Sequence, residues 1–222
     1  MTTPIERAAN YSAAFPKYPP LAADDRWLYG IWMMGNNYRG SGYYGAYPPG
    51  YIPRVMALFP EAKSVLHLFS GSLAKGPYVR FDVRPDVDSD VRGDAHHLDN
   101  YFDLNSFDLI LADPPYSVED AQRYGPPMVD RKQVLTGCTR ILRPGGNLVW
   151  LDQVLPMYRK SELHLWGLIG LVRSTNHRFR VATFFGKVGS HRKRSEATPA
   201  NASPVQPRKK RSRESQSRAN EE

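Results

Sequence analysis

The chain has 222 residues, of which 41% are hydrophobic and 23% charged, and this is the composition of a soluble globular protein with one sizeable core. No apolar run approaches the ~20 residues of a membrane span, and residues 1–14 do not resemble a signal peptide, so we expect a cytoplasmic protein with no membrane partner. The chain has a single cysteine, so we expect neither an internal disulfide nor a zinc site. The net charge of +8 and the pI near 9.6 suit a polyanionic partner, although ten of the basic residues and only four acidic ones lie in residues 187–222.

Composition divides the chain into three parts. Residues 1–60 are rich in Tyr, Trp, Pro and Gly, and we expect this N-terminal segment to pack on a central catalytic domain. Residues 61–188 alternate short apolar runs with helical patterns and form that domain. Residues 189–222 are mostly Ser, Pro, Arg and Lys, which predicts a disordered basic tail. Within it, residues 207–213 resemble a nuclear import signal and would serve equally as a non-specific nucleic-acid tether.

The predicted elements follow a strand–helix alternation. Residues 52–59 predict a short helix, and Asp130 is placed to cap a helix over residues 131–142 that Pro144 and two glycines stop. Apolar runs predict strands at 64–69, 79–82, 89–92, 107–112, 147–152, 167–172 and 179–185. Because these runs do not alternate in polarity, they fit strands covered on both faces of a mostly parallel sheet. The sequence therefore predicts an α/β three-layer sandwich with a seven-stranded sheet that ends in an antiparallel hairpin.

Polar residues gather where the predicted strands end. A glycine turn occupies residues 69–72, and Asp82, Asp94, Asp113 and Asp152 end or follow the later strands. Ligands of open α/β sheets bind at the carboxyl ends of the strands, so these residues together form a candidate site. For any single aspartate, a loop or capping role is the simpler explanation.

The segment from Asp113 to Tyr116, with Pro114 and Pro115 between them, has a chemical rationale. The amino nitrogen of adenine or cytosine is a poor nucleophile because its lone pair is delocalised into the ring. The Asp113 carboxylate and a backbone carbonyl such as that of Pro114 offer acceptors for its two protons, which favours a pyramidal nitrogen. The prolines restrict the backbone, and Tyr116 offers a ring on which an extruded base can stack. A Pro-Pro turn beside a partly buried tyrosine is the structural alternative.

Residues 44–187 resemble the S-adenosylmethionine-dependent amino-methyltransferases of DNA, which form N6-methyladenine or N4-methylcytosine on a Rossmann-like class I methyltransferase fold. Their catalytic motif, [DNS]-P-P-[YFW], is matched by residues 113–116. Their donor motif, Phe-x-Gly-x-Gly after an apolar strand, is approximated by residues 69–72. Residues 142–146 are similar to the Leu-Lys-Pro-Gly-Gly turn of class I methyltransferases, and residues 44–49 to the N-terminal donor-pocket motif.

The resemblance implies S-adenosylmethionine as the cofactor, with Gly71 permitting its close approach to the backbone. Asp82 would bind the ribose hydroxyls, with Asp86 and Asp88 as substitutes, and Asp94 would accept the adenine amino group. A turn or capping role for Asp82 and Asp94 is the alternative. The implied cofactor-binding residues are Tyr47, Pro48, Phe69, Ser70, Gly71, Ser72, Asp82 and Asp94.

The chain departs from the family's pattern in two places. Ser72 stands where the second glycine is expected, and only ten residues separate Gly71 from Asp82, so the helix between them would have at most one or two turns. No target-recognition segment is inserted between the donor and catalytic motifs. Candidate substrate contacts are therefore few, and a solvated hairpin turn is an equal explanation for most of them. They are Tyr124, Arg173, Asn176, His177 and Arg178, with the aromatic-rich residues 39–44 as a possible lid.

Three functions fit these observations. The first is methylation of a DNA base. The resemblance implies adenine N6 rather than cytosine N4, since Asp113 and Tyr116 occupy the ends of the motif. The second is the same chemistry on RNA, whose small methyltransferases share a similar motif. The third is a catalytically silent fold that binds nucleic acid or a partner subunit. His96 and His97 have no third ligand at a suitable spacing, so we expect no metal.

Overall fold

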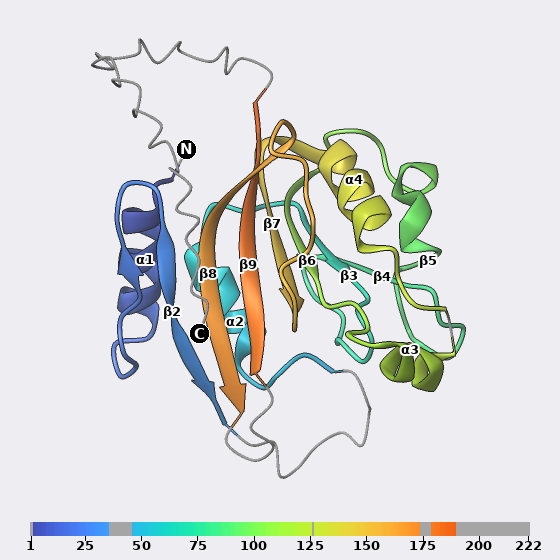
Figure 1. The fold of residues 1–222 in the computed structure, drawn as a ribbon, viewed down its shortest axis with the longest axis horizontal. Coiled ribbons are helices and arrows are strands. Elements are labelled where there is room, and N and C mark those ends of the chain that lie inside the picture. Colours follow the sequence, from blue (N-terminus) through green and yellow to red (C-terminus); the bar gives the residue numbers. More distant parts are fainter. Residues whose placement is uncertain (1, 36–45, 126, 174–178, 190–222) are drawn as a thin grey trace, which may run out of the picture. The chain divides into compact units, whose positions relative to one another are not determined.

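The computed structural model describes residues 2–35, 46–125, 127–173 and 179–189 (Figure 1). The predicted tail therefore lies outside the described residues, apart from Gly189. The helices are α1 (Pro4–Ala14), α2 (Tyr51–Leu58), the 3₁₀ helix η1 (Ala95–Asn100), α3 (Val118–Tyr124) and α4 (Arg131–Ile141). The strands are β1 (Ala22–Ala23), β2 (Leu28–Met34), β3 (Val65–Leu68), β4 (Val79–Asp82), β5 (Val91–Arg92), β6 (Phe107–Ala112), β7 (Leu142–Asp152), β8 (Leu163–Arg173) and β9 (Phe179–Lys187).

The nine strands of the described residues form one sheet in the order β1-β2-β8-β9-β7-β6-β3-β4-β5. The strands from β5 through β3 and β6 to β7 are parallel, whereas β9 is antiparallel to both of its neighbours, β7 and β8. The α/β class, the mostly parallel core and the closing antiparallel pair of the class I methyltransferase fold are thereby confirmed. The predicted number of seven strands is wrong, because β1 and β2 extend the sheet beyond β8.

The two additional strands and α1 arise from residues in which the sequence predicted no element. Helix α1 begins with a capping box, in which Thr3 and Glu6 bond each other's backbone N–H groups. Strand β2 pairs in parallel with β8 along its whole length. Its polarity does not alternate in the sequence, because apolar residues occupy both of its faces. Leu28, Trp32 and Met34 are buried, and Tyr29, Ile31 and Met33 are exposed.

Helices cover the sheet from both sides, which gives the predicted three layers (Figure 1). Along β6, Leu109 and Leu111 belong to the core cluster formed with α1 and α2. The alternate residues Ile110 and Ala112 belong to the second cluster, formed with η1 and α4. This alternation follows from the two-residue period of a strand. The Asp130 cap of α4 is confirmed, since its Oδ1 accepts the N–H groups of Lys132 and Gln133.

The connection between β3 and β4 contains no helix, so the short helix expected after the donor motif is wrong. A turn follows β3, in which the N–H of Leu73 donates to the carbonyl of Ser70. The buried guanidinium of Arg80 then donates to the carbonyl of Leu73 at 2.9 Å. The same guanidinium pairs with Asp90 at 2.9 Å. Backbone and side-chain hydrogen bonds therefore hold this short crossover in place of a helix.

Every parallel strand ends at one edge of the sheet, which we call the carboxyl edge. Strand β8 runs parallel to β7 because both are antiparallel to β9. The loops after β3, β4, β5, β6, β7 and β8 therefore all leave from this edge, and β9 begins there. Within the described part of the chain, no helix has the length and apolar character needed to cross a membrane.

Candidate active site

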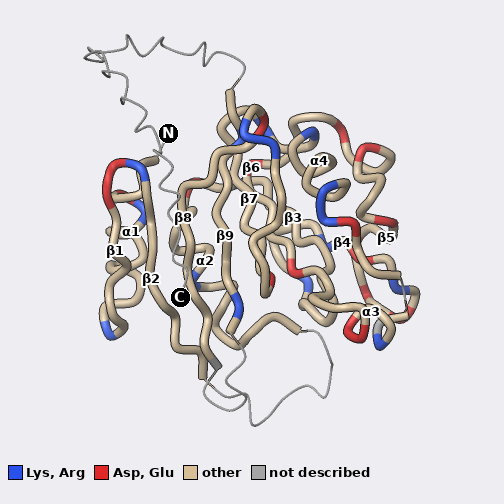
Figure 2. The backbone as a smooth tube through the Cα atoms, in the orientation of Figure 1, with Lys and Arg blue, Asp and Glu red and all other residues tan. Residues whose placement is uncertain are grey.

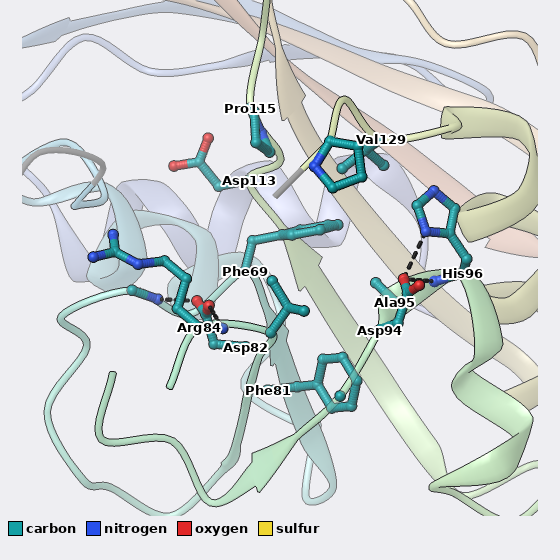
Figure 3. Close-up of a pocket in the computed structure, with 14 residues that line it drawn as sticks. Phe69, Phe81, Asp82, Arg84, Asp94, Ala95, His96, Asp113, Pro115 and Val129 are labelled. Atoms are coloured by element: carbon teal, nitrogen blue, oxygen red, sulfur yellow. Dashed lines mark hydrogen bonds and ion pairs between the residues drawn. The ribbon is translucent and has the colours of Figure 1, made fainter. Parts of the chain in front are cut away.

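A pocket of about 800 Å³ opens at the carboxyl edge, between the ends of β3, β4, β5 and β6. Figure 3 shows Phe69 near its centre, with Asp82 and Arg84 on one side, Asp94 and His96 on the other, and Asp113 beyond them. The remaining lining residues are Gly71, Phe81, Val83, Gly93, Ala95, Pro115, Pro127 and Val129.

The turn after β3 is tied to the end of β4 by a carboxylate. One oxygen of Asp82 accepts the N–H of Gly71 at 2.9 Å, and the other accepts the N–H of Arg84 at 3.0 Å. Gly71 has a φ of 51°, a left-handed conformation that favours glycine. Phe69 shares that region, with a φ of 59°. The predicted Phe-x-Gly turn is therefore sharply bent, and Asp82 holds its apex against the pocket.

Asp94 forms the opposite wall and also caps η1. Its Oδ1 accepts the N–H of His96 at 2.9 Å and contacts Nδ1 of the same imidazole at 2.6 Å. Nε2 of His96 accepts the N–H of Asp130 at 2.9 Å. The imidazole therefore carries its proton on Nδ1 and connects η1 to the start of α4. Both aspartates that the resemblance implied line the pocket, whereas the substitutes Asp86 and Asp88 do not.

The other implied donor-binding residues lie behind or beside the pocket. Pro48 and Ser70 are buried, and Ser72 is exposed. Tyr47 stacks on Tyr51 of α2 with 5.6 Å between ring centroids, and its hydroxyl lies 3.4 Å from Nδ1 of the buried His67. None of these four implied residues lines the pocket in this structure.

The Asp113 segment begins directly after β6 and brings its carboxylate to the rim of the pocket. The hydroxyl of Tyr116 donates a hydrogen bond to Asp113. Burial raises the pKa of Asp113 to about 7, against the opposing positive charge of Arg180 and the hydrogen bond from Tyr116. Burial and the neighbouring Asp113 carboxylate raise the pKa of Tyr116 well above its ordinary value, so this hydroxyl remains a neutral donor.

A buried ion pair fixes the backbone of this segment. The carboxylate of Asp152, fully buried at the end of β7, accepts from Nε of Arg131 at 2.7 Å and from the indole of Trp150 at 3.1 Å. The same Arg131 side chain donates to the carbonyl of Tyr116 at 3.1 Å. Asp152 therefore acts through Arg131 to place the end of the segment. The sequence showed Asp152 as a strand-end acid, but nothing in it paired that residue with Arg131.

A second arginine contacts the ring of Tyr116. The guanidinium carbon of Arg180, the second residue of β9, lies 4.7 Å from the ring centroid. It occupies one face of the ring, so a base would have to stack on the other. This contact joins residues 64 positions apart, and no sequence signal marks it.

The predicted substrate contacts are only partly placed. Tyr124 ends α3 and Arg173 ends β8, so the backbone of Arg173 lies at the carboxyl edge. Asn176, His177 and Arg178 lie outside the described residues, as do positions 39–44. Acidic residues gather around β4, β5 and α3, whereas β2, β8 and β9 contain none (Figure 2). Among the described residues, no group of three His, Cys, Asp or Glu side chains is placed to hold a metal ion.

Solved structures that are similar to this chain include two that are named as methyltransferases. TrmN from Thermus thermophilus is 18% identical with a TM-score of 0.42, over 57% of this chain and 44% of that one. An arsenic(III) S-adenosylmethionine methyltransferase from Chlamydomonas reinhardtii is 14% identical with a TM-score of 0.32, over 57% of this chain and 63% of that one. The CurJ carbon methyltransferase is 11% identical with a TM-score of 0.37, over 62% of this chain and 52% of that one. This chain thus spans about half the length of these proteins. No protein-family model and no curated protein matches its sequence.

Proposed function

We propose that this protein is an S-adenosylmethionine-dependent methyltransferase that methylates the exocyclic amino group of a DNA base, with adenine N6 as the acceptor. The observation that carries the proposal is the position of Asp113. It is a half-buried carboxylate that follows β6, is next to two prolines and lines the pocket at the carboxyl edge. The preference for DNA and for adenine rests on the resemblance of residues 113–116 to the family's motif.

The residues of the pocket fit S-adenosylmethionine. Apolar and aromatic side chains such as Phe69, Phe81 and Val129 can enclose an adenine ring. Three carboxylates, those of Asp82, Asp94 and Asp113, complement a ligand that carries a positive sulfonium and an amino group. Each oxygen of Asp82 accepts only one backbone N–H from the described residues, which leaves lone pairs for ribose hydroxyls.

The chain's own groups account for activation and positioning of the acceptor. When bound, S-adenosylmethionine supplies a methyl group, whose bond to sulfur breaks as the bond to the amino nitrogen forms. Asp113 accepts a hydrogen bond from the amino group and so directs the nitrogen lone pair away from the base ring. Arg131 holds the carbonyl of Tyr116, and the prolines fix the intervening backbone. As the amino group is methylated, its proton can pass to Asp113, whose pKa of about 7 suits it to release that proton to water.

Transfer of labelled methyl from S-adenosylmethionine tests the proposal, with unmethylated DNA and total RNA as separate acceptors and mass spectrometry of the product nucleosides. We expect N6-methyladenine in DNA from the wild-type protein and none from Asp113→Ala. The matched control is Asp25→Asn, which removes an exposed carboxylate from the loop before β2 and should retain transfer. Label in RNA alone would assign RNA as the acceptor polymer, and failure to bind the donor would refute the enzymatic function.

A further inference from the structure

The Arg180 guanidinium is held at the active site by the sheet rather than by a loop. Arg180 pairs with Leu171 in the ladder between β8 and β9. Its alternate neighbours Ala182 and Phe184 face the core cluster that contains α2. The two-residue period of the strand therefore directs Arg180 to the same face of the sheet, between α2 and the Asp113 segment.

Two contacts connect this guanidinium with the acceptor carboxylate. It lies over the ring of Tyr116 at 4.7 Å, within the range of a cation–π interaction. The hydroxyl of that ring donates to Asp113. The charge of Arg180 also favours the ionised form of Asp113 directly. Arg180 thus acts on Asp113 both through Tyr116 and through space.

The other ionisable groups around Asp113 give it no positive charge. Asp152 of β7 opposes its ionisation. The hydroxyls of Tyr47 and of Tyr51 in α2 are neutral, because burial raises the pKa of each. The guanidinium of Arg131 forms an ion pair with Asp152. Arg180 is therefore the cation that favours ionisation of Asp113 among the described residues.

The Arg180 side chain is also incompletely satisfied by the protein. Its Nε is buried and has no hydrogen-bond partner among the described residues. A buried donor without a partner lowers the stability of the fold. A side chain that served only to stabilise the fold would not need a charge at this point, since an apolar residue would cover Tyr116 without that cost.

We propose that Arg180 is a positioning residue of this active site, which clamps the ring of Tyr116 and provides the positive charge that keeps Asp113 an anionic acceptor for the amino protons. The proposal rests on the methyltransferase function proposed above. It gives Arg180, a residue of the closing hairpin, a role toward the Asp113 carboxylate that follows β6.

The test compares Arg180→Gln, which removes the charge, with Arg180→Lys, which retains it. Arg26→Gln is the matched control, because Arg26 is an exposed arginine before the start of β2, at the opposite edge of the sheet. The first readout needs no donor: carbon NMR of labelled aspartate carboxyls follows the titration of Asp113, assigned by its loss in Asp113→Asn. We expect the midpoint to lie about one pH unit higher in Arg180→Gln and to stay near the wild-type value in the other two variants.

The second readout is the pH profile of single-turnover methyl transfer at saturating S-adenosylmethionine. The Arg180→Gln profile should rise at higher pH than the wild-type profile, so that its rate is about tenfold lower near pH 7 and largely restored near pH 9. An unshifted titration of Asp113, or a rate lowered equally at every pH, would overturn the role of Arg180. Should Arg180→Gln fail to fold, Tyr116→Phe removes the hydroxyl but keeps the ring, and it must also raise the Asp113 midpoint. Absence of transfer by the wild-type protein would instead count against the proposed function, while the NMR titration still decides the inference.

Discussion

The two halves of the carboxyl edge use their carboxylates differently. In the half around β3 to β5, which we call the donor half after the proposed function, the carboxylates of Asp82 and Asp94 accept backbone N–H groups and hold loops in place. In the half that follows β6, the proposed acceptor half, Asp113 accepts a hydrogen bond from the Tyr116 hydroxyl and is half-buried. Burial raises the pKa of Asp113 to about 7. Under the proposed function, the first arrangement shapes the donor site and the second provides the carboxylate that accepts the amino protons.

The largest effect on stability is expected where the acceptor half depends on a buried ion pair. Arg131→Met leaves the buried Asp152 without its charged partner, and we expect the free energy of unfolding to fall by roughly 3–5 kcal/mol. Denaturant titration measures this loss. The double variant with Asp152→Asn should recover part of it, because both charges are then absent. A single variant as stable as the wild type would show that the pair does not hold the acceptor half together.

Replacing Asp113 is expected to change the free energy of unfolding by a smaller amount, and to raise it rather than lower it. Its pKa of about 7 in the folded protein exceeds the value near 4 of an unfolded chain, so the folded state retains a proton between these values. Wild-type stability should therefore fall as the pH rises from about 4 to 7 and stay level above it. Asp113→Asn lacks this dependence and should be more stable by roughly 2–4 kcal/mol at pH 8 and by little at pH 4. Thermal or denaturant unfolding across this range, with Asp25→Asn as the control, distinguishes the outcomes, and a gain that does not vary with pH would contradict the assignment.

In the donor half, Asp82→Asn should lower both stability and donor affinity. An amide has one acceptor oxygen where the carboxylate has two, so either the Gly71 or the Arg84 amide loses its partner. We expect a loss of about 1–3 kcal/mol in unfolding free energy and a dissociation constant for S-adenosylmethionine at least tenfold higher. Calorimetric titration measures the affinity. Unchanged affinity would mean that the Asp82 wall does not contact the donor.

The smallest change in stability is expected in the turn after β3 that contains Gly71. Gly71→Ala places a side chain on a residue with a φ of 51°, and this strain should cost about 1 kcal/mol. Ser72→Ala is the matched control, because Ser72 is exposed and has no left-handed φ. Equal melting temperatures for the two variants would show that the turn accommodates a side chain at position 71 with little strain.

The sequence predicted those parts of the fold and site that depend on neighbours in the chain. The apolar run over 107–112 and the segment 113–116 are local, and so is the cap that Asp130 provides for α4. Strand β2 was missed because both of its faces are apolar, so no alternation of polarity marks it. The helix expected after Gly71 is absent because the side chain of Arg80 holds the crossover instead.

Contacts between distant elements were not predictable in the same way. Arg131 and Asp152 lie on α4 and β7, and Arg180 meets Tyr116 only because β9 is inserted between β7 and β8. The spacing of residues along the chain does not predict such pairs. The sequence motif therefore predicts Asp113 itself, whereas the residues that surround Asp113 are known only once the order of the strands in the sheet is known.

The most direct test of the division between the two halves is single-turnover methyl transfer to unmethylated DNA at saturating S-adenosylmethionine, compared between Asp82→Asn and Asp113→Asn. We predict that Asp82→Asn regains most of the wild-type rate once the donor is saturating, while Asp113→Asn stays slower by a factor of about 10²–10⁴. Two results would contradict the assignment of donor binding to one half and chemistry to the other. One is a wild-type rate in Asp113→Asn, and the other is an equal loss of rate in both variants that saturating S-adenosylmethionine does not restore.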